Sequence, residues 1–195
     1  MMMVLTGGLA AGKSTVAKFL EQHGAQIIDT DQIAKKLLEP FSPCFKEVLA
    51  HFGPPVLNPD RSLDRKKLRQ KIFEHPQDRL WLENLLHPEI QRIVLEETQK
   101  AQAKFKVIVV PLFRSKKNYP ADLVLSVECP EKEQIQRVMK RDLISESLAK
   151  KMIAAQPSSE ERQALADEVI WNTGTPQELE KNVSKFLTSL GDFLQ

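Results

Sequence analysis

A glycine-rich segment near the start of the chain constrains its fold more than any other feature. Residues 7–14 read Gly-Gly-Leu-Ala-Ala-Gly-Lys-Ser and match the pattern G-x-x-x-x-G-K-[ST] in full. The segment follows an apolar run, Met2–Leu5, and precedes a helical pattern. A strand, a glycine-rich turn and a helix in this order gather backbone N–H groups and a helix N-terminus around one anion. The sequence therefore predicts a phosphate-binding loop in an α/β fold.

The motif predicts a role for each of its defining residues. Gly7 and Gly12 allow the backbone to turn. Lys13 can reach the β- and γ-phosphates of a nucleotide, and the Ser14 hydroxyl can ligate Mg²⁺. A chance glycine-rich turn is the alternative interpretation, and the flanking strand and helix argue against it.

Short apolar runs alternate with helical patterns along the rest of the chain, which indicates a parallel sheet covered by helices on both faces. The predicted strands are 2–5, 26–28, 107–110, 123–127 and 168–171. Capping residues, helical spacing and turn residues predict helices over 13–23, 43–51, 65–74, 78–86, 88–103, 159–166 and 176–190. The expected caps include Ser42 for the second helix, Ser62 or Asp64 for the third, and a capping box from Ser158 to Glu161 for the sixth. We expect a break between two of these helices at His87-Pro88, because proline disfavours a helical residue before it.

Composition excludes several other classes of protein. The 28 basic and 26 acidic side chains leave a net charge of +2, too mild for a nucleic-acid binder. The apolar stretch Val107–Val110 ends at Pro111, and it is far short of a membrane span. The first residues lack the basic start of a secretory signal, and two cysteines cannot build a disulfide framework or a four-ligand zinc site. We therefore expect a cytoplasmic protein that acts without nucleic acid or membrane.

Two carboxylates follow the second predicted strand. Residues i and i+2 of an extended segment point the same way, so Asp29 and Asp31 are expected to share a face beside the phosphate loop. A carboxylate there can accept a proton from an attacking hydroxyl or hold a metal-bound water. The alternative is that Thr30 or Asp31 only caps a helix that begins near Gln32. The third strand runs into Pro111-Leu112-Phe113 without an acid, which argues against a GTP-hydrolysing switch.

Basic residues gather in two regions outside the loop. Arg137 and Arg141 are four apart in a helical segment, a spacing that lets both meet one transferring phosphate. Six of the twelve residues from Asp60 to Lys71 are basic, which would suit an acidic, phosphorylated acceptor. In both regions a solvated helix surface is the alternative. His87 before a proline is either a ligand-binding residue or an N-cap.

The distance between the second and third strands exceeds what one crossover helix requires. We expect one domain, residues 1–195, with two insertions. Residues 32–104 would form a helical subdomain that covers the substrate, and residues 131–156, between the fourth and fifth strands, would form a lid.

Several motifs together resemble the dephospho-CoA kinase family over nearly the whole chain. They are Thr6-Gly7-Gly8 with Gly12-Lys13-Ser14-Thr15, Ile28-Asp29-Thr30-Asp31-Gln32-Ile33-Ala34, His87-Pro88-Glu89-Ile90, Arg137 with Arg141-Asp142, and Asn172-Thr173-Gly174. The resemblance implies transfer of the ATP γ-phosphoryl group to the ribose 3′-hydroxyl of dephospho-CoA, the last step of coenzyme A synthesis. It also implies a P-loop NTPase fold whose five parallel strands lie in the order 2-3-1-4-5, with a helical CoA-binding insertion and a mobile lid.

The resemblance further implies roles for individual residues, with ATP and Mg²⁺ as cofactors. Asp31 would be the base for the 3′-hydroxyl, and Arg137 and Arg141 would act from the lid. The ATP-binding residues would be Gly8, Ala10, Ala11, Gly12, Lys13, Ser14, Thr15 and, near the base, Asn172. Arg65, Arg69 and His87 would bind dephospho-CoA, while Ser14 and Asp29 would serve the metal. We expect a monomer or a weak homo-oligomer.

Two departures from the family pattern change what is expected of the site. Ala10 and Ala11 replace the usual glycine and serine of the loop, and an alanine at positive φ would cost about 1 kcal/mol. Arg114 stands where the family carries an acid. Two other functions stay open from the residues alone: a kinase for a nucleoside monophosphate or a sugar, and a nucleotide-binding regulator without an acceptor.

Overall fold

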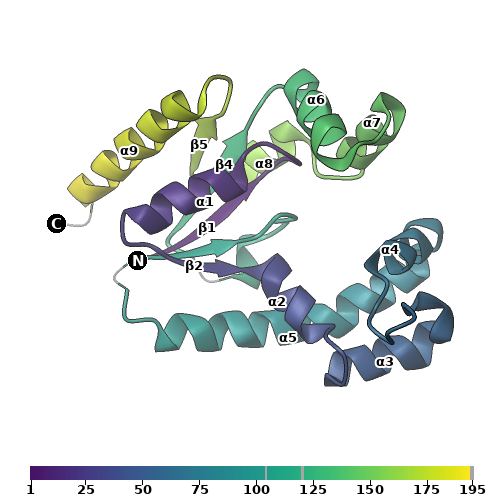
Figure 1. Cartoon of the computed structure of the whole chain (residues 1–195). Helices are drawn as coiled ribbons and strands as arrows, with labels where there is room; N and C mark the ends of the chain where they lie inside the picture. The colour runs from purple at the N-terminus through teal and green to yellow at the C-terminus, as the bar shows by residue number, and fades with distance from the viewer. Residues whose placement is uncertain (104, 120, 194–195) are drawn as a thin grey trace. The chain divides into compact units, whose positions relative to one another are not determined.

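The computed structural model describes residues 1–103, 105–119 and 121–193 (Figure 1). Residues 192 and 193 are described by their backbone alone. The chain forms two compact units. One consists of Met1–Asp29 and Lys100–Gln195, and the other is Thr30–Gln99. The sequence predicted an insertion over residues 32–104. The second unit begins and ends slightly earlier than that range.

The first unit is built on a five-stranded sheet in which every neighbouring pair is parallel. The strands are β1 (Met2–Gly7), β2 (Gln26–Asp29), β3 (Lys106–Val109), β4 (Leu123–Glu128) and β5 (Glu168–Trp171). Their order is β2-β3-β1-β4-β5, as the family resemblance implied. β1 lies in the centre, with Leu5 opposite Val109 on one side and Leu125 on the other. The phosphate loop therefore emerges from the middle of the sheet.

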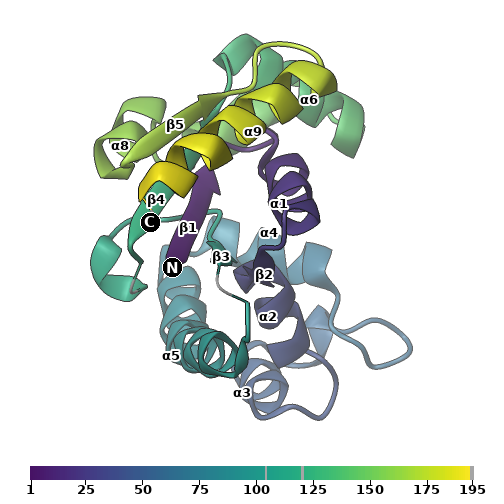
Figure 2. The ribbon, with the colours of Figure 1, turned by 90° about the vertical axis from the view of Figure 1, so that its left-hand side faces the viewer.

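Two helices pack on one face of this sheet. Helices α1 (Lys13–Gln22) and α9 (Pro176–Phe193) lie next to each other (Figures 1 and 2). Met3 and Leu5 of β1 join one buried cluster with Val16 and Leu20 of α1 and Val183 of α9. Since neighbouring strand residues alternate between faces, Val4 and Thr6 point to the opposite side.

Three helices separate β4 from β5. They are α6 (Glu131–Asp142), α7 (Glu146–Ala154) and α8 (Ser159–Leu165). The α6–α7 pair occupies the residues predicted to form a lid, while α8 contacts β1 and β4. Ser158 and Glu161 exchange the two hydrogen bonds of a capping box at the start of α8, as the sequence predicted. A 3₁₀ helix, η2 (Lys116–Asn118), precedes β4.

The second unit is helical. It contains α2 (Thr30–Leu37), α3 (Pro43–Phe52), the 3₁₀ helix η1 (Pro54–Val56), α4 (Arg65–Glu74) and α5 (Pro76–Lys100). Side chains predicted to cap two of these helices do so. Ser42 accepts a hydrogen bond from the Phe45 N–H, and Asp64 accepts from the N–H groups of Lys66 and Lys67. Both arrangements follow from the preference of short oxygen-bearing side chains for the N-cap.

The expected break at His87-Pro88 is wrong. A single helix, α5, runs from Pro76 to Lys100 with Pro88 inside it. Its buried residues keep one spacing on both sides of the proline, at Leu82, Leu86, Ile90 and Val94. A proline inside a helix costs about 3 kcal/mol, and burying two or three such side chains offsets that cost. Among the described residues, no helix is long and apolar enough to cross a membrane.

Candidate functional site

The glycine-rich segment forms a tight loop between β1 and α1. Gly7 and Gly12 have φ values of 146° and 109°. A Cβ on Gly7 would lie 2.2 Å from the Val127 carbonyl oxygen, and one on Gly12 would lie 2.4 Å from Asn172 Nδ2. Both positions therefore require glycine for their backbone angle and for the space around them. Gly12 has no side chain, so no side-chain cap bonds to the start of α1, and the N-terminus of a helix favours a nearby anion.

The two alanines of the loop differ in conformation. Ala10 has a φ of 56°, in the left-handed region, so the strain expected of an alanine in this loop is present there. Ala11 is fully buried and lies outside that region. The expected cost of about 1 kcal/mol therefore applies to Ala10 alone.

Lys13 begins α1 and folds back over the loop. Its ammonium donates hydrogen bonds to the carbonyl oxygens of Gly7 (2.7 Å) and Gly8 (2.8 Å). The positive charge is thereby held at the start of the loop, next to the N-terminus of α1. Ser14 is exposed and Thr15 half-buried in the first turn of the same helix. This local arrangement concentrates positive charge and N–H donors within a few residues, which suits a polyphosphate.

Asn172 contacts the loop directly, a contact that sequence reasoning did not predict. Its side-chain amide is buried and donates to the Ala11 carbonyl oxygen at 2.8 Å. Its backbone N–H donates to the Glu128 carbonyl oxygen. Asn172 follows β5, so these bonds tie the edge of the sheet to the centre of the phosphate loop. Its expected place near the nucleotide base stays a prediction.

The two arginines predicted to act from a lid have different surroundings. Arg137 Nη2 donates to Glu133 (2.6 Å) and to the Asn172 carbonyl oxygen (3.1 Å), which brings it to the residue that supports the loop. Arg141 makes two 2.8 Å hydrogen bonds to Asp142, and this pairing raises the pKa of its guanidinium. Both arginines are on α6, one turn apart.

The segment from Asp29 to Asp31 is not extended, so the reason given for the two carboxylates to share a face does not hold. The alternative that Thr30 or Asp31 caps a helix beginning near Gln32 is wrong, because the helix already begins at Thr30. Asp29 is the last residue of β2, but α2 begins at Thr30 and places Asp31 in its first turn. Asp29 is half-buried and Asp31 is exposed. A carboxylate in a first helical turn is favoured by the helix dipole, so Asp31 has a structural reason to be there as well as a chemical one.

The predicted acceptor-binding residues are exposed in the helical unit. Arg65 and Arg69 are one turn apart on α4, and His87 is on α5. Arg65 donates to the carbonyl oxygen of Lys35 at the end of α2 (3.1 Å). Arg114, at the position where the family pattern has an acid, is exposed in the first unit.

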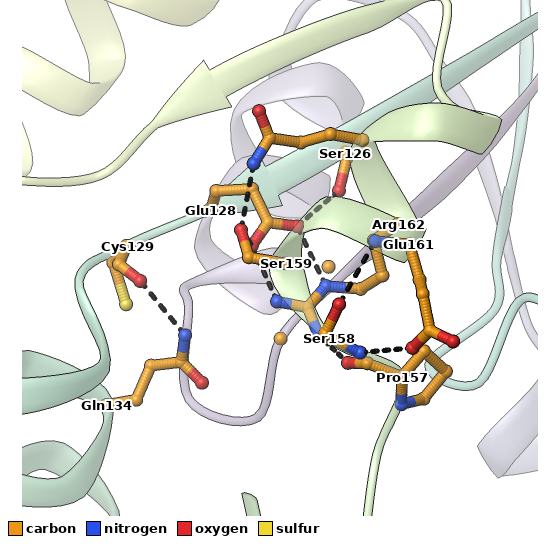
Figure 3. Close-up of polar contacts among 12 residues, drawn as sticks. Ser126, Glu128, Cys129, Gln134, Pro157, Ser158, Ser159, Glu161 and Arg162 are labelled. Carbon is orange, nitrogen blue, oxygen red and sulfur yellow. Dashed lines mark hydrogen bonds and ion pairs between the residues drawn. The ribbon is translucent and has the colours of Figure 1, made fainter. Parts of the chain in front are cut away.

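Sequence reasoning also missed a buried ion pair beside the loop, between Glu128 at the end of β4 and Arg162 of α8 (Figure 3). Neither residue belongs to a motif, and the pair spans thirty-four positions of sequence. Next to it, burial raises the pKa of the Cys129 thiol to about 11, so that thiol stays protonated and is no nucleophile.

A parallel sheet with β1 at its centre, a glycine-rich loop holding a lysine, and arginines on a helix after β4 define a kinase of the P-loop class. The family model described as CoaE, dephospho-CoA kinase, matches residues 1–178. The chain belongs to the dephospho-CoA kinase family, whose members are ATP-dependent kinases of coenzyme A biosynthesis.

Relatives of known name or structure agree with this assignment. The dephospho-CoA kinase of Coxiella burnetii is 41% identical over 181 residues, covering 92% of this chain and 91% of that protein. The crystal structure of TT1252 from Thermus thermophilus has a TM-score of 0.81 at 30% identity, with 97% of each chain covered. Dephospho-CoA kinase from Campylobacter jejuni has a TM-score of 0.72 at 26% identity, with 100% of this chain and 98% of that one covered.

Proposed function

We propose that this chain transfers the γ-phosphoryl group of ATP to the ribose 3′-hydroxyl of dephospho-CoA, and that individual residues bind the nucleotide, the metal and the acceptor. The observation that carries the proposal is the family match over residues 1–178, because it spans the whole helical unit as well as the phosphate loop. The loop alone would leave the acceptor undefined, since many kinases share it.

On the nucleotide side, the phosphate loop binds the ATP phosphates. The N–H groups at the start of α1 and the Lys13 ammonium face an anion, and in a site that excludes water such donors stabilise charge that develops during transfer. The carbonyl oxygens of Gly7 and Gly8 hold Lys13 in place until the phosphates bind.

The oxygen donors of this region fit Mg²⁺ rather than a metal held by protein alone. Among the residues described, no group of three or more His, Cys, Asp or Glu side chains could hold an ion. Mg²⁺ commonly takes one or two protein oxygens together with phosphates and waters. The Ser14 hydroxyl and the Asp29 carboxylate are suitable donors of this kind. When bound, Mg²⁺ supplies positive charge to the β- and γ-phosphates.

On the acceptor side, Asp31 is the general base. Its carboxylate takes the proton of the ribose 3′-hydroxyl as that oxygen bonds to the γ-phosphorus, while the bond from the γ-phosphorus to the bridging oxygen breaks and ADP leaves. Arg65, Arg69 and His87 bind dephospho-CoA; the two arginines offer paired charges to its phosphate groups. Arg137 and Arg141 act on the transferring phosphoryl group when residues 131–156 close as a lid.

An ADP-release assay tests the function against its two rivals. Dephospho-CoA, AMP and simple sugars are offered in turn with ATP and Mg²⁺. We expect turnover with dephospho-CoA well above the turnover with the other acceptors. Faster turnover on AMP or a sugar would favour the other kinase, and ATP binding without turnover on any acceptor would favour a regulator.

We also propose that the protein works in the cytoplasm as a monomer or a weak homo-oligomer, without a nucleic-acid or membrane partner. The mild net charge of +2 supports the part of this proposal that concerns nucleic acid. Light scattering across a range of protein concentrations tests the oligomeric state, since a tight dimer would keep its mass on dilution.

A further inference from the structure

A buried ion pair joins the two ends of the segment predicted to be the lid. Glu128 ends β4, three residues before α6 begins, and Arg162 is on α8, just after the segment. Arg162 Nη2 lies 2.6 Å from Glu128 Oε2, and Nε lies 2.8 Å from Oε1. Arg162 Nη1 also donates to the carbonyl oxygen of Pro157, the first residue after the segment. One guanidinium therefore holds the chain before residues 131–156 and the chain after them.

The carboxylate of this pair is fully surrounded by donors. The Ser126 hydroxyl donates to Glu128 Oε1 at 2.7 Å and the Ser159 hydroxyl to Oε2 at 2.9 Å (Figure 3). The side chains of Arg162 and Glu128 are 6% and 0% exposed. Desolvating two charges offsets most of the attraction between them, so a buried pair is weak evidence for added stability. Its directed hydrogen bonds, however, define the position of every group that they join.

The same guanidinium lies against the phosphate loop. A Cβ on Gly8 would come within 3.0 Å of Arg162 Nη2 and 2.9 Å of Gln134 Oε1. Gln134 is the fourth residue of α6, and its amide donates to the Cys129 carbonyl oxygen, between β4 and the lid. The Gly8 carbonyl oxygen in turn accepts a hydrogen bond from Lys13. The pair, the start of α6 and the loop that carries Lys13 thus meet at Gly8.

From these contacts we propose that Glu128 and Arg162 are positioning residues for phosphoryl transfer, which fix the two ends of the lid against the phosphate loop. This inference rests on the proposed function, because it assumes that residues 131–156 close over bound ATP. Arg137 comes six residues after the start of α6 and must reach the γ-phosphoryl group within a fraction of an ångström. A fixed base for α6 at Gly8 makes each closure bring Arg137 to the same place.

The double variant Glu128→Gln/Arg162→Met tests the proposal without leaving a buried charge alone. Glutamine keeps an oxygen that accepts from one of the two serine hydroxyls, and its amide N–H can donate to the other hydroxyl oxygen. Methionine fills much of the arginine's volume. Each single variant leaves an unpaired charge and is expected to lower the melting temperature more than the double variant does. Arg162→Lys keeps the charge but cannot hold both carboxylate oxygens and Pro157 together. Arg92→Met, in an exposed ion pair of α5, is the matched control.

We expect the double variant to melt near the wild-type temperature yet to lose roughly 10- to 100-fold in kcat, with a much smaller change in the KM for ATP. Arg162→Lys should show a kcat loss of the same kind, and Arg92→Met should keep full turnover. A double variant with the melting temperature and the kcat of the wild type would overturn the proposal, because the ion pair would then serve the fold alone. A rise in the KM for ATP at normal kcat would also overturn it.

Hydrogen exchange separates this proposal from the proposed function. In the wild type, a non-hydrolysable ATP analogue with Mg²⁺ should slow amide exchange across residues 131–156, and the double variant should lose that protection while it still binds the analogue. This measurement needs no acceptor, so it decides the proposal even if dephospho-CoA gives no turnover. Equal protection in both proteins would contradict a positioning role.

Discussion

Ala10 illustrates how one residue sets the energy of the phosphate loop. Its backbone lies in the left-handed region, which costs a residue with a Cβ about 1–2 kcal/mol. Glycine removes that cost but gives the unfolded chain more freedom, worth about 0.4–1 kcal/mol in the opposite direction. We therefore expect Ala10→Gly to raise the free energy of unfolding by about 0.5–1 kcal/mol in a denaturant titration.

The neighbouring alanine provides the control for that prediction. Ala11 is buried and lies outside the left-handed region, so Ala11→Gly removes a packed methyl group without relieving strain. It should lower the free energy of unfolding. If both variants lose stability, the left-handed conformation of Ala10 costs less than we infer.

Lys13 should matter for phosphoryl transfer and little for folding. Its ammonium bonds to carbonyl oxygens of its own loop, and its proposed role is to stabilise charge on the phosphates. We expect Lys13→Ala to lower kcat by roughly 10²–10³-fold, as the loss of one preorganised donor does elsewhere. Its melting temperature should stay close to that of the wild type. Near-normal turnover of this variant would contradict the assignment of the phosphate loop.

Replacing the Asp31 carboxylate with an amide should lower kcat. Asn keeps the size of Asp and its ability to cap a helix but cannot accept the 3′-hydroxyl proton, so Asp31→Asn should lower kcat by roughly 10²-fold or more. Asp29→Asn is the matched comparison and should cost less, because it changes only a donor to the metal. Small and equal losses in kcat, or a large fall in melting temperature for Asp31→Asn alone, would favour a structural role for the Asp31 carboxylate in the first turn of α2.

At the scale of elements, the lid helix α6 carries arginines whose effect should depend on closure. Arg137 and Arg141 would engage the phosphoryl group only in the closed state, so Arg137→Ala and Arg141→Ala should lower kcat more than they raise either KM. Lys132→Ala, at an exposed position of the same helix, should leave both constants unchanged. Higher KM values at normal kcat in the arginine variants would show that these residues only bind ground-state substrate.

Local signals predicted most of the elements, because those signals act within a few residues. The capping box at Ser158 and the apolar run that becomes β3 are examples, each decided by its own sequence. The run of α5 through Pro88 was not predictable in this way, because the buried residues on either side of the proline decide it. The contact of Asn172 with Ala11 joins residues 161 positions apart, and only the finished sheet brings them together.

The candidate site shows the same division. The motif identified the phosphate-loop residues, since the loop is one continuous segment. The motif could not identify the ion pair between Glu128 and Arg162, because nothing in the sequence indicates which of the 26 acidic side chains pairs with which basic side chain. The start of α2 at Thr30 was also missed, since an apolar strand that ends in Asp-Thr-Asp does not state whether the next residues are extended or helical.

At the scale of the whole molecule, the loop and the helical unit have complementary tasks. In the proposed reaction, the Met1–Asp29 and Lys100–Gln195 unit binds ATP, and the Thr30–Gln99 unit contributes Asp31 and the basic helix α4. The proposed reaction therefore needs residues of both units, because an ATP phosphate must meet a ribose hydroxyl of a large acidic acceptor. Neither unit suffices for that reaction.

The most direct test is to identify the product formed from ATP and dephospho-CoA. Phosphorus NMR and mass spectrometry of the reaction should show one added phosphoryl group, attached at the ribose 3′-oxygen, with one ADP released for each. The 3′-deoxy analogue of dephospho-CoA and the Lys13→Ala variant are the two controls, and both should yield little or no product. A phosphoryl group at any other position, or ADP release that continues at the full rate with the 3′-deoxy analogue, would contradict the account.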